Sequence, residues 1–328
     1  MTKLGFSLLL LLVFNISALP QQKVALQHNG ATTIFSSGNP FADAYTAAVS
    51  GDTIYLPGGN IPIQTVLNKS LKIYGAGHNP DSSSATSATV LSGSFSVQEN
   101  AVGLRLEGIE ITGDITFSGV LTNVAITRCK LRHLTLSGTN HTVSESVITG
   151  NIGFGTSSSN LISNNVIQGV ISGGTLNGIR NNILLFIGNS YAFYNVENTS
   201  IINNIIFQNY LSAGRIQSGC KLSAFGYNVF SATPIADNNT FEANYFNVDL
   251  STVFVNQTGT LFDYSQNYHL VNPSTYHDVN NAQIGIYGGP YPWKQGSVPT
   301  NPHIVSKVIS SETNAAGHLN VTIRVEAQ

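Results

Sequence analysis

The sequence between residues 103 and 193 divides into five segments of similar length and pattern. They read GLRLEGIEITGDITFSG (103–119), VLTNVAITRCKLRHLTLSG (120–138), TNHTVSESVITGNIGFG (139–155), TSSSNLISNNVIQGVISGG (156–174) and TLNGIRNNILLFIGNSYAF (175–193). Each segment is 17 or 19 residues long and holds two or three short apolar runs separated by Gly, Asn, Ser or Thr. Such runs between turn-forming residues are typical of β-strands, and no 3.6-residue helical period runs through them. The stretch therefore predicts a solenoid in which each segment is one coil.

Aligning the five segments places one apolar residue of each coil in a single column, made of Ile111, Leu131, Ile148, Ile167 and Leu184. A second column, two residues earlier, holds small and amide side chains: Cys129, Ser146, Asn165 and Asn182. The pattern returns later in the chain at Asn204, with weaker echoes at Asn228 and Asn244. Stacked amide side chains can hydrogen-bond from coil to coil, which satisfies polar groups that are costly to bury. The sequence therefore predicts an asparagine ladder inside the solenoid.

The composition of the chain is unusual in its low charge. Charged residues make up 9% of the 328 residues, whereas about 25% is usual for a soluble domain. Hydrophobic residues still make up 42%, and the abundance of Ile, Val, Phe and Tyr favours a folded, β-rich chain over a disordered one. The formal net charge is -2, so the basic excess of nucleic-acid-binding proteins is missing and we expect no nucleic-acid partner.

The N-terminus has the pattern of a secretory signal peptide. Lys3 precedes an apolar run over residues 8–14, and the small residues Ser17 and Ala18 follow, so cleavage near Ala18 would remove residues 1–18. The apolar run is too short to span a bilayer, and no later segment approaches about 18 apolar residues. We therefore expect a secreted or cell-surface protein that does not span the membrane.

The chain has two cysteines, Cys129 and Cys220. An exported protein with two cysteines can form a disulfide, but bridging needs Cα atoms within about 7 Å, and a solenoid places these two residues several coils apart. We expect two buried, unpaired thiols.

The predicted solenoid has distinct patterns at its two ends. Residues 40–50 fit a short helix that plugs the open end, with Asn39 as its N-cap and Pro40 in its first turn. After Pro302, two apolar alternations at residues 304–309 and 319–325 predict a β-hairpin. This hairpin either caps the solenoid or leads to an attachment signal.

The chain therefore divides into three parts. We expect a signal peptide over residues 1–18, a β-helix domain with its N-terminal cap over residues 19–300, and a C-terminal hairpin or tail over residues 301–328.

These features resemble the right-handed parallel β-helix of the pectate-lyase-like superfamily. The entrance motifs GDTIYLPGG (51–59) and LKIYGAG (71–77) are similar to the first coils of many such proteins. The closing motifs IGIYGGP (284–290), PWK (292–294) and NPH (301–303) resemble those of uncharacterised secreted β-helix proteins common in Bacteroidetes. The resemblance implies an all-β, right-handed parallel β-helix of roughly a dozen coils, at about 20 residues per coil.

The catalytic motifs known from this superfamily do not recur in the chain. Pectate lyases of this fold hold calcium with a cluster of Asp carboxylates and use an Arg as base, because calcium takes six to eight oxygen ligands. In the aligned coils no two Asp residues fall in the same or adjacent columns, and the Asn-Thr-Asp, Asp-Asp, Gly-His-Gly and Arg-Ile-Lys motifs of polygalacturonases are absent. Calcium is therefore possible but unsupported, and we expect no metal or other cofactor.

A cluster of charged residues in the early coils supplies the candidates for catalysis: Arg128, Arg132, His133 and Glu145. In one interpretation these residues line a saccharide cleft, with Arg or His as base and Glu as acid. In the other, the alignment places Arg128 over Glu145 and Glu110 over Lys130, which gives cross-strand salt bridges with a structural role. We favour the structural interpretation.

Aromatic residues supply the candidates for ligand binding. Two thirds of them lie between residues 186 and 293, and the candidates for stacking against a sugar ring are Tyr191, Tyr194, Tyr210 and Trp293. The alternative is that Phe rings fill the coils while Tyr rings line turns with their hydroxyls in water.

Three functions remain open from the sequence. The first is a non-catalytic exported protein that binds a polysaccharide or cell-surface glycan, or matrix, as a monomer. The second is a polysaccharide lyase or glycoside hydrolase with an unrecognised site, and the third is a purely structural or adhesion module. We favour the first, because the known catalytic motifs are missing and a chain with 9% charged residues offers few groups for an active site.

Overall fold

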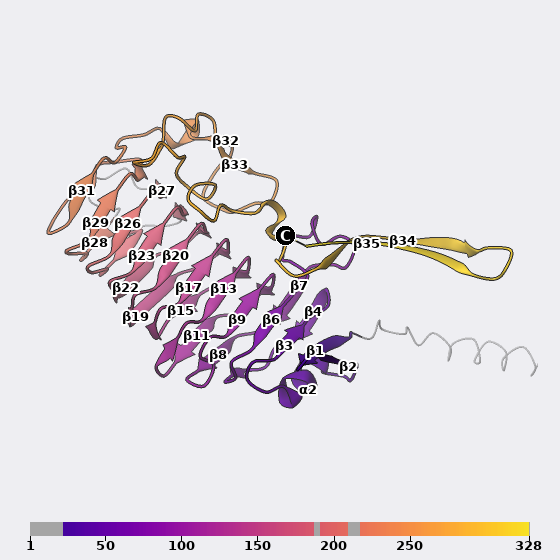
Figure 1. The fold of residues 1–328 in the computed structure, drawn as a ribbon. Coiled ribbons are helices and arrows are strands. Elements are labelled where there is room, and N and C mark those ends of the chain that lie inside the picture. The colour runs from indigo at the N-terminus through magenta and orange to yellow at the C-terminus, as the bar shows by residue number, and fades with distance from the viewer. Residues whose placement is uncertain (1–21, 187–190, 209–216, 328) are drawn as a thin grey trace, which may run out of the picture.

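The chain folds as a parallel β-helix of about nine turns, with a small N-terminal cap and a C-terminal segment that returns along its side (Figure 1). The structure is a computed structural model and describes residues 22–186, 191–208 and 217–327. The prediction of an all-β parallel solenoid is confirmed. The predicted signal peptide, residues 1–18, lies outside the described residues.

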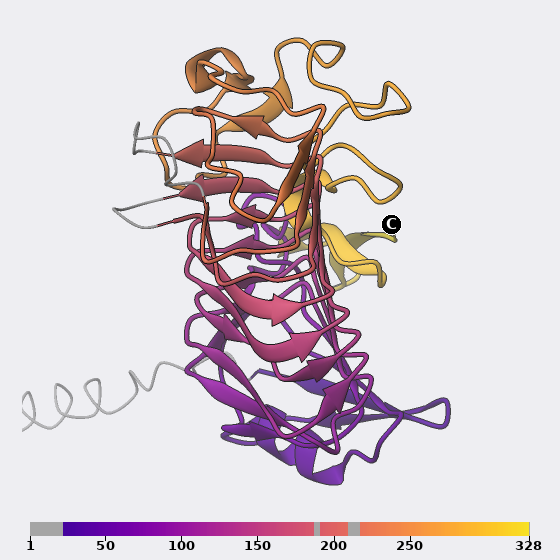
Figure 2. The ribbon, with the colours of Figure 1, turned by 90° about the vertical axis from the view of Figure 1, so that its left-hand side faces the viewer.

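Three parallel sheets, here named A, B and C, run along the solenoid, and each turn visits them in that order (Figures 1 and 2). The parallel strands of sheet A are β3 (Thr53–Tyr55), β6 (Lys72–Tyr74), β9 (Arg105–Glu107), β13 (Ala125–Thr127), β17 (Thr142–Ser144), β20 (Leu161–Ser163), β23 (Gly178–Arg180), β26 (Ser200–Ile202), β29 (Ala224–Gly226) and β31 (Thr240–Glu242). The strands of sheet B are β4 (Gly59–Pro62), β7 (Thr89–Ser92), β10 (Glu110–Ile111), β14 (Lys130–Leu131), β18 (Val147–Ile148), β21 (Val166–Ile167), β24 (Ile183–Phe186), β27 (Ile205–Gln208) and β30 (Val229–Phe230). The strands of sheet C are β5 (Val66–Leu67), β8 (Phe95–Gln98), β11 (Ile115–Ser118), β15 (Leu134–Thr135), β19 (Ile152–Ser158), β22 (Ile171–Thr175), β25 (Phe193–Tyr194) and β28 (Gln217–Ser218), with β12 (Leu121–Thr122) and β16 (Gly138–Thr139) beside them.

The predicted apolar column forms the inner face of sheet B. Leu131 pairs with Ile148, Ile148 with Ile167, and Ile167 with Leu184, each in parallel register. All of these side chains are at most 2% exposed and belong to one core that runs through the solenoid. Because strand neighbours lie about 4.8 Å apart, the stack buries a continuous apolar column, as the sequence predicted.

The predicted asparagine ladder lies at the corner where each coil passes from sheet A to sheet B. The backbone N–H of each member donates to the side-chain oxygen of the next, from Asn165 to Asn182 and from Asn182 to Asn204, at 2.9 Å in both cases. The same contact joins the whole series of Cys129, Ser146, Asn165, Asn182, Asn204, Asn228 and Asn244. The ladder is thus confirmed, and it extends to the positions that the sequence marked as weaker echoes.

A second ladder, which the sequence analysis missed, lies at the corner between sheets C and A. Here too each backbone N–H donates to the side chain of the next coil, through Val124, His141, Asn160, Asn177, Thr199, Ser223 and Asn239. Each member precedes the corresponding member of the first ladder by five residues. Both ends of the sheet A strands from β13 to β31 are therefore fixed by side-chain contacts.

The N-terminal cap closes the first coil. Strands β1 (Val24–His28) and β2 (Ala31–Phe35) pair antiparallel, and β1 also pairs antiparallel with β3. Helix α2 (Pro40–Ala47) begins after Asn39, whose side chain accepts the Ala42 N–H at 3.2 Å. The helix buries Phe41 and Ala44 against the solenoid, so the predicted capping helix and its N-cap are confirmed.

Beyond β31 the chain leaves the coil path, which is why the turns number about nine where the sequence predicted a dozen. The following segment contains a 3-10 turn, η1 (Leu250–Thr252), the antiparallel pair β32 (Phe254–Asn256) and β33 (Asn267–Leu270), and a second 3-10 turn, η2 (Gln295–Ser297). It packs on the outer face of sheet B, where Val147, Val166, Ile183, Ile205 and Val229 form an apolar cluster with Val253, Phe254, Tyr268, Leu270, Ile284, Ile286 and Trp293. Residues after 245 therefore form a covering layer and add no coils.

The last part of this layer, residues 284–300, runs back toward the first coils, and we name it the return strap. Its hydrogen bonds reach progressively earlier coils: the Gly285 N–H donates to Asn203 O, the Asn164 amide donates to Ile286 O, and the Thr300 N–H donates to Glu107. The strap thus crosses the corner between sheets A and B over most of the length of the solenoid.

The predicted C-terminal hairpin is confirmed as β34 (His303–Thr313) and β35 (Leu319–Glu326), which pair antiparallel. It projects away from the solenoid beside the first coils (Figure 1). A hairpin in this position does not cap the far end of the solenoid.

The two cysteines are buried and unpaired, as predicted.

Candidate functional site

The charged residues singled out from the sequence lie at two different corners of the coils. Arg128 and Glu145 precede β14 and β18 at the corner between sheets A and B, whereas Arg132 and His133 follow β14 at the corner between sheets B and C. The strand between them separates the two pairs. The four candidates therefore do not converge on one site.

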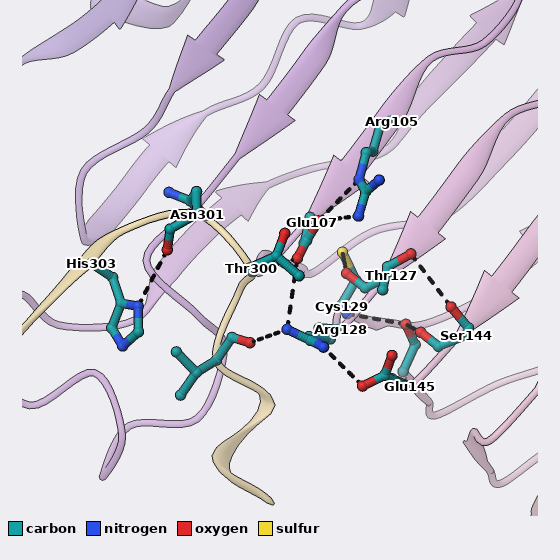
Figure 3. A network of polar contacts seen from close by, with 12 residues as sticks. Arg105, Glu107, Thr127, Arg128, Cys129, Ser144, Glu145, Thr300, Asn301 and His303 are labelled. Atoms are coloured by element: carbon teal, nitrogen blue, oxygen red, sulfur yellow. Dashed lines mark hydrogen bonds and ion pairs between the residues drawn. The ribbon is translucent and has the colours of Figure 1, made fainter. Parts of the chain in front are cut away.

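Arg128 and Glu145 form part of a buried network under the return strap (Figure 3). The Arg128 Nε–H donates to Glu145 Oε2 at 3.0 Å, and the Arg128 Nη1–H donates to the backbone oxygen of Val298 at 2.8 Å. The two side chains are 5% and 7% exposed. The predicted pairing of Arg128 with Glu145 is confirmed, but it lies beneath a covering segment and does not form an open row on the surface.

Glu107 completes this network and binds the strap directly (Figure 3). Its carboxylate accepts two N–H bonds from Arg105, at 2.7 and 3.0 Å, and the backbone N–H of Thr300 at 2.6 Å. The Arg128 guanidinium lies 3.9 Å from Oε1, the oxygen that also accepts the Thr300 N–H, and the Glu107 side chain is fully buried. Because the charged groups are bonded to each other and to strap backbone, the network can hold the strap to the solenoid.

The corner itself explains why these side chains meet the strap. Arg128, Glu145, Asn164, Asn181 and Asn203 occupy equivalent corner positions, with left-handed φ angles between 50° and 61°. Asn adopts this conformation most readily among residues with a side chain, which accounts for its repeated use. Asn164 and Asn181, like Arg128, donate to strap carbonyls.

Arg132 and His133 lie on an exposed part of the molecule. The Arg132 guanidinium forms a bidentate pair with the Asp114 carboxylate, at 2.7 and 2.9 Å, and this contact lowers the pKa of Asp114. His133 Nδ1 accepts the backbone N–H of Asn151 at 2.9 Å. Both residues thus have structural partners in neighbouring coils. Glu110 and Lys130 also form the predicted pair, at 3.0 Å.

The aromatic candidates do not share one face. Tyr194 lies on β25 of sheet C and is 46% exposed, and Tyr191 precedes it with a partly exposed side chain. Tyr210 lies outside the described residues. Trp293 is 9% exposed and packs in the apolar cluster on sheet B. Trp293 therefore lies in the covering layer, apart from the tyrosines of sheet C, and does not form one open stacking platform with them.

A hollow that the sequence analysis did not identify lies where the covering layer meets the early coils. Its volume is about 240 Å³, and its walls come from three separate segments, which we name together the aromatic hollow. The lining residues are Asn79, Asp81, Ser82, Phe262, Asp263, Tyr264, Gln266, Tyr268, Tyr287, Trp293, Gln295, Gly296 and Ser297. Five of these side chains are aromatic, and others carry carboxylate or amide groups.

The rings of the hollow are held by contacts with each other and with the coils. Phe262 stacks on Tyr268 with centroids 5.8 Å apart and meets Tyr264 edge-on at 4.9 Å. The Tyr264 hydroxyl donates to the backbone oxygen of His78 at 3.0 Å and lies 2.8 Å from His78 Nδ1, and the Lys130 ammonium lies over its ring. Burial raises the pKa of Tyr264, so its hydroxyl keeps its proton. The walls of the hollow are therefore fixed before any ligand arrives.

The polar groups of the hollow are suited to hydrogen bonding. The Asp263 carboxylate accepts the Ser265 hydroxyl at 2.7 Å and the Ser265 N–H at 2.8 Å, which lowers its pKa. The Tyr268 hydroxyl donates to the Gln266 side chain at 2.6 Å. An ionised carboxylate and a positioned amide beside aromatic rings can bind a molecule that has both hydroxyl groups and an apolar face.

The sequence contained one signal for this hollow, namely the concentration of aromatic residues after residue 186. It could not show that residues near 80 and near 265 meet, because their contact depends on the path of the covering layer. Among the described residues, no group of three His, Cys, Asp or Glu side chains is placed to hold a metal ion. No helix in the described part of the chain is long and apolar enough to cross a membrane.

The chain was compared with family models, curated proteins and solved structures. No family model matches the chain, and no curated protein matches it. A solved structure, the crystal structure of pectate lyase Pel9A, is similar with a TM-score of 0.41 and 15% sequence identity, covering 81% of this chain and 94% of that one.

Proposed function

We propose that the protein is an exported, non-catalytic polysaccharide-binding protein and that the aromatic hollow holds one sugar residue of the chain it binds. The observation that carries this proposal is the lining of the hollow, which combines five aromatic side chains with Asp81, Asp263 and Gln266. A sugar ring offers apolar C–H faces to aromatic rings and hydroxyls to carboxylates and amides. The volume of about 240 Å³ lies below the roughly 300–1,000 Å³ of sites for drug-sized ligands, which suits a single sugar unit.

The positions of the charged candidates support a binding role over catalysis. Arg128 and Glu145 are buried and bonded to each other and to the strap, and Arg132 is paired with Asp114. A general base must come within hydrogen-bond reach of a substrate, and the strap covers Arg128. Export is supported by the signal-like N-terminus, with Lys3, an apolar run and Ser17-Ala18.

The single tryptophan of the chain provides a direct test, because Trp293 lies in the wall of the hollow. Neutral oligosaccharides (glucan, mannan, galactan and xylan fragments) and acidic ones (alginate and polygalacturonate fragments) would be titrated while Trp293 fluorescence is recorded. We expect a saturable change with at least one of them and no release of unsaturated or reducing ends on prolonged incubation. Unchanged fluorescence with every sugar, together with no retention on the parent polysaccharides, would refute the proposal.

A matched pair of variants tests whether the sugar binds in the hollow. Asp81→Asn removes a carboxylate that lines the hollow while keeping its shape, and Asp43→Asn removes an exposed carboxylate on the distant helix α2. Hydrogen bonds to charged groups are worth about 1.5–3 kcal/mol, so Asp81→Asn should weaken binding by about tenfold or more. Equal affinities for the two variants would place the ligand elsewhere on the protein.

A further inference from the structure

The C-terminal hairpin, β34 and β35, is a long ribbon whose outer part has no packing partner among the described residues. Every residue of β35 is exposed, and the ribbon projects clear of the solenoid (Figure 1). An isolated two-stranded hairpin is at best marginally stable in water. A ribbon of this length is therefore expected to gain stability from a further surface.

The two faces of the ribbon differ in polarity. Cross-strand partners share a face, and the pairs Ile304 with Val325, Lys307 with Ile323, Ile309 with Val321 and Thr313 with Leu319 define one of them. On that face the apolar residues Ile309, Leu319, Val321, Ile323 and Val325 are 52%, 48%, 52%, 52% and 54% exposed. The opposite face carries the polar residues Ser306, Thr322 and Arg324, together with one exposed apolar residue, Val308.

The apolar face begins at the solenoid and continues beyond it. Ile304 and Lys307 line a hollow of about 540 Å³ together with Tyr55, Leu56 and Pro57 of the first coil. The rest of the face has no solenoid surface opposite it, since the ribbon points outward (Figure 1). This face of the described ribbon carries one charged residue, Lys307, which is exposed on β34. The flexible side chain of Lys307 can place its ammonium group in water beyond the edge of the ribbon.

We propose that this apolar face binds the same face of a second copy of the chain, so that two ribbons pack face to face about a twofold axis. A twofold interface uses the same surface patch on both copies, so one apolar face can serve both partners. Ile304 and the five half-exposed side chains offer on the order of 500 Å² of apolar surface per copy. Two copies would then remove about 1,000 Å² from water, which is the lower bound for a specific interface. The expected product is a weak dimer, and this replaces the monomer expected from the sequence.

The first test is sedimentation velocity of the purified protein from about 1 to 200 μM, with two variants that differ by one position. Ile323→Lys places a charge on the apolar face, and Thr322→Lys places the same charge on the opposite face of the same strand. We expect reversible dimerisation of the wild type with a dissociation constant in the micromolar range, a loss of affinity of at least tenfold for Ile323→Lys, and a change below threefold for Thr322→Lys. Both side chains are exposed, so thermal melts should show that both variants stay folded.

The second test is a site-specific cross-link. Val321 lies near the middle of the apolar face, so the variant Val321→Cys should form a covalent dimer under mild oxidation. The variant Thr322→Cys, on the opposite face, should not. The native thiols do not interfere, because Cys129 and Cys220 are buried.

Three results would overturn the proposal. They are a wild type that stays monomeric up to 200 μM, equal association of Ile323→Lys and the wild type, and a monomer that instead sediments with neutral lipid vesicles unless Ile323 is replaced. None of these results depends on Trp293 fluorescence, so the ribbon dimer and the sugar-binding hollow can fail independently.

Discussion

Asn182 illustrates how single side chains hold one coil to the next. It is fully buried, its oxygen accepts the Asn165 N–H, and its amide donates to Ile162 O and to the Asn204 oxygen at 2.9 and 3.0 Å. Replacing it leaves polar groups in two neighbouring coils without partners. The side chain of Asn182 therefore contributes to the stability of the coils before and after its own.

We predict that Asn182→Ala lowers the free energy of unfolding by about 2–4 kcal/mol, because each unsatisfied buried group costs about 1–3 kcal/mol. Urea unfolding followed by circular dichroism would measure the loss. Asn280→Ala, at an exposed position, is the control and should change little. Equal midpoints for the two variants would show that the ladder contributes nothing to stability.

His78 makes stability depend on pH in a defined window. Burial lowers its pKa to about 3, its side chain is fully buried, and its Nε2 has no hydrogen-bond partner among the described residues. Below pH 6.5 the unfolded chain binds a proton at His78 that the folded chain does not, so stability should fall from pH 6.5 toward pH 3. His141, whose pKa burial also lowers, adds to the same trend.

The measurement is the urea midpoint at pH 7, 5.5 and 4. We expect a steady decline for the wild type, a smaller decline for His78→Gln, and a wild-type slope for His318→Gln, which lies in the exposed hairpin turn. The aspartates with lowered pKa values, such as Asp114, lose their contribution only as the pH falls below their ordinary range. A flat midpoint between pH 7 and 4 would contradict the assignment.

The second ladder shows what residue-scale sequence analysis could have found. Its members stand five residues before those of the first ladder in every coil, as Asn160 before Asn165 and Asn177 before Asn182. The spacing is constant because each sheet A strand is three residues long with a fixed corner, whereas the other turns vary in length. The alignment emphasised amide side chains, so the His, Thr and Ser members of the column were not recognised.

At the scale of elements, the return strap is held by side chains that project from equivalent corners. Arg128 is the central contact, since it binds both Glu145 and the Val298 carbonyl. Removing one partner of a buried ion pair costs about 3–5 kcal/mol, because a charge is left uncompensated.

We predict that Arg128→Gln destabilises the fold by about that amount and releases the strap, so that limited proteolysis cuts within residues 284–300 before it cuts the coils. The double variant Arg128→Gln/Glu145→Gln should regain part of the loss, because the uncompensated carboxylate is gone. Arg132→Gln, which breaks an exposed pair with Asp114, should change little. Wild-type protease resistance in Arg128→Gln would mean that the strap is held by its apolar contacts alone.

The sequence of the sheet B strands also indicates the covering layer. Val147–Ile148 and Val166–Ile167 are adjacent apolar pairs, and neighbouring residues of a strand point to opposite faces. One member fills the solenoid and the other must be covered from outside. The pairs thus predict a second layer, but they do not identify the segment that forms it, because that depends on contacts across a hundred residues.

At the scale of the whole molecule, the fold was more predictable than the site. The coils repeat a local pattern, so strands, ladder and apolar column follow from residues 103–193 alone. The aromatic hollow instead joins Asp81 with Asp263 and Trp293, which no repeat relates. Its assembly depends on the path of the covering layer, and that path is set by packing on sheet B.

The strap also changes how the molecule unfolds as a unit. A solenoid is stabilised between neighbouring repeats, and its terminal coils are the first to open. Here the strap contacts coils from Asn203 back to Glu107, so the late coils are linked to the early ones by a second connection. Opening the last coils therefore also disturbs contacts near the start of the rod.

The same path has a mechanical consequence. The described chain enters at β1 and passes from the strap into β34 at His303, and both positions lie beside the first coils. Tension applied between these two positions would act first on the strap contacts at Glu107 and Arg128. It would then detach the strap from the coils in sequence, starting at the first coils. The stacked coils themselves would carry little of that force until the strap had come away.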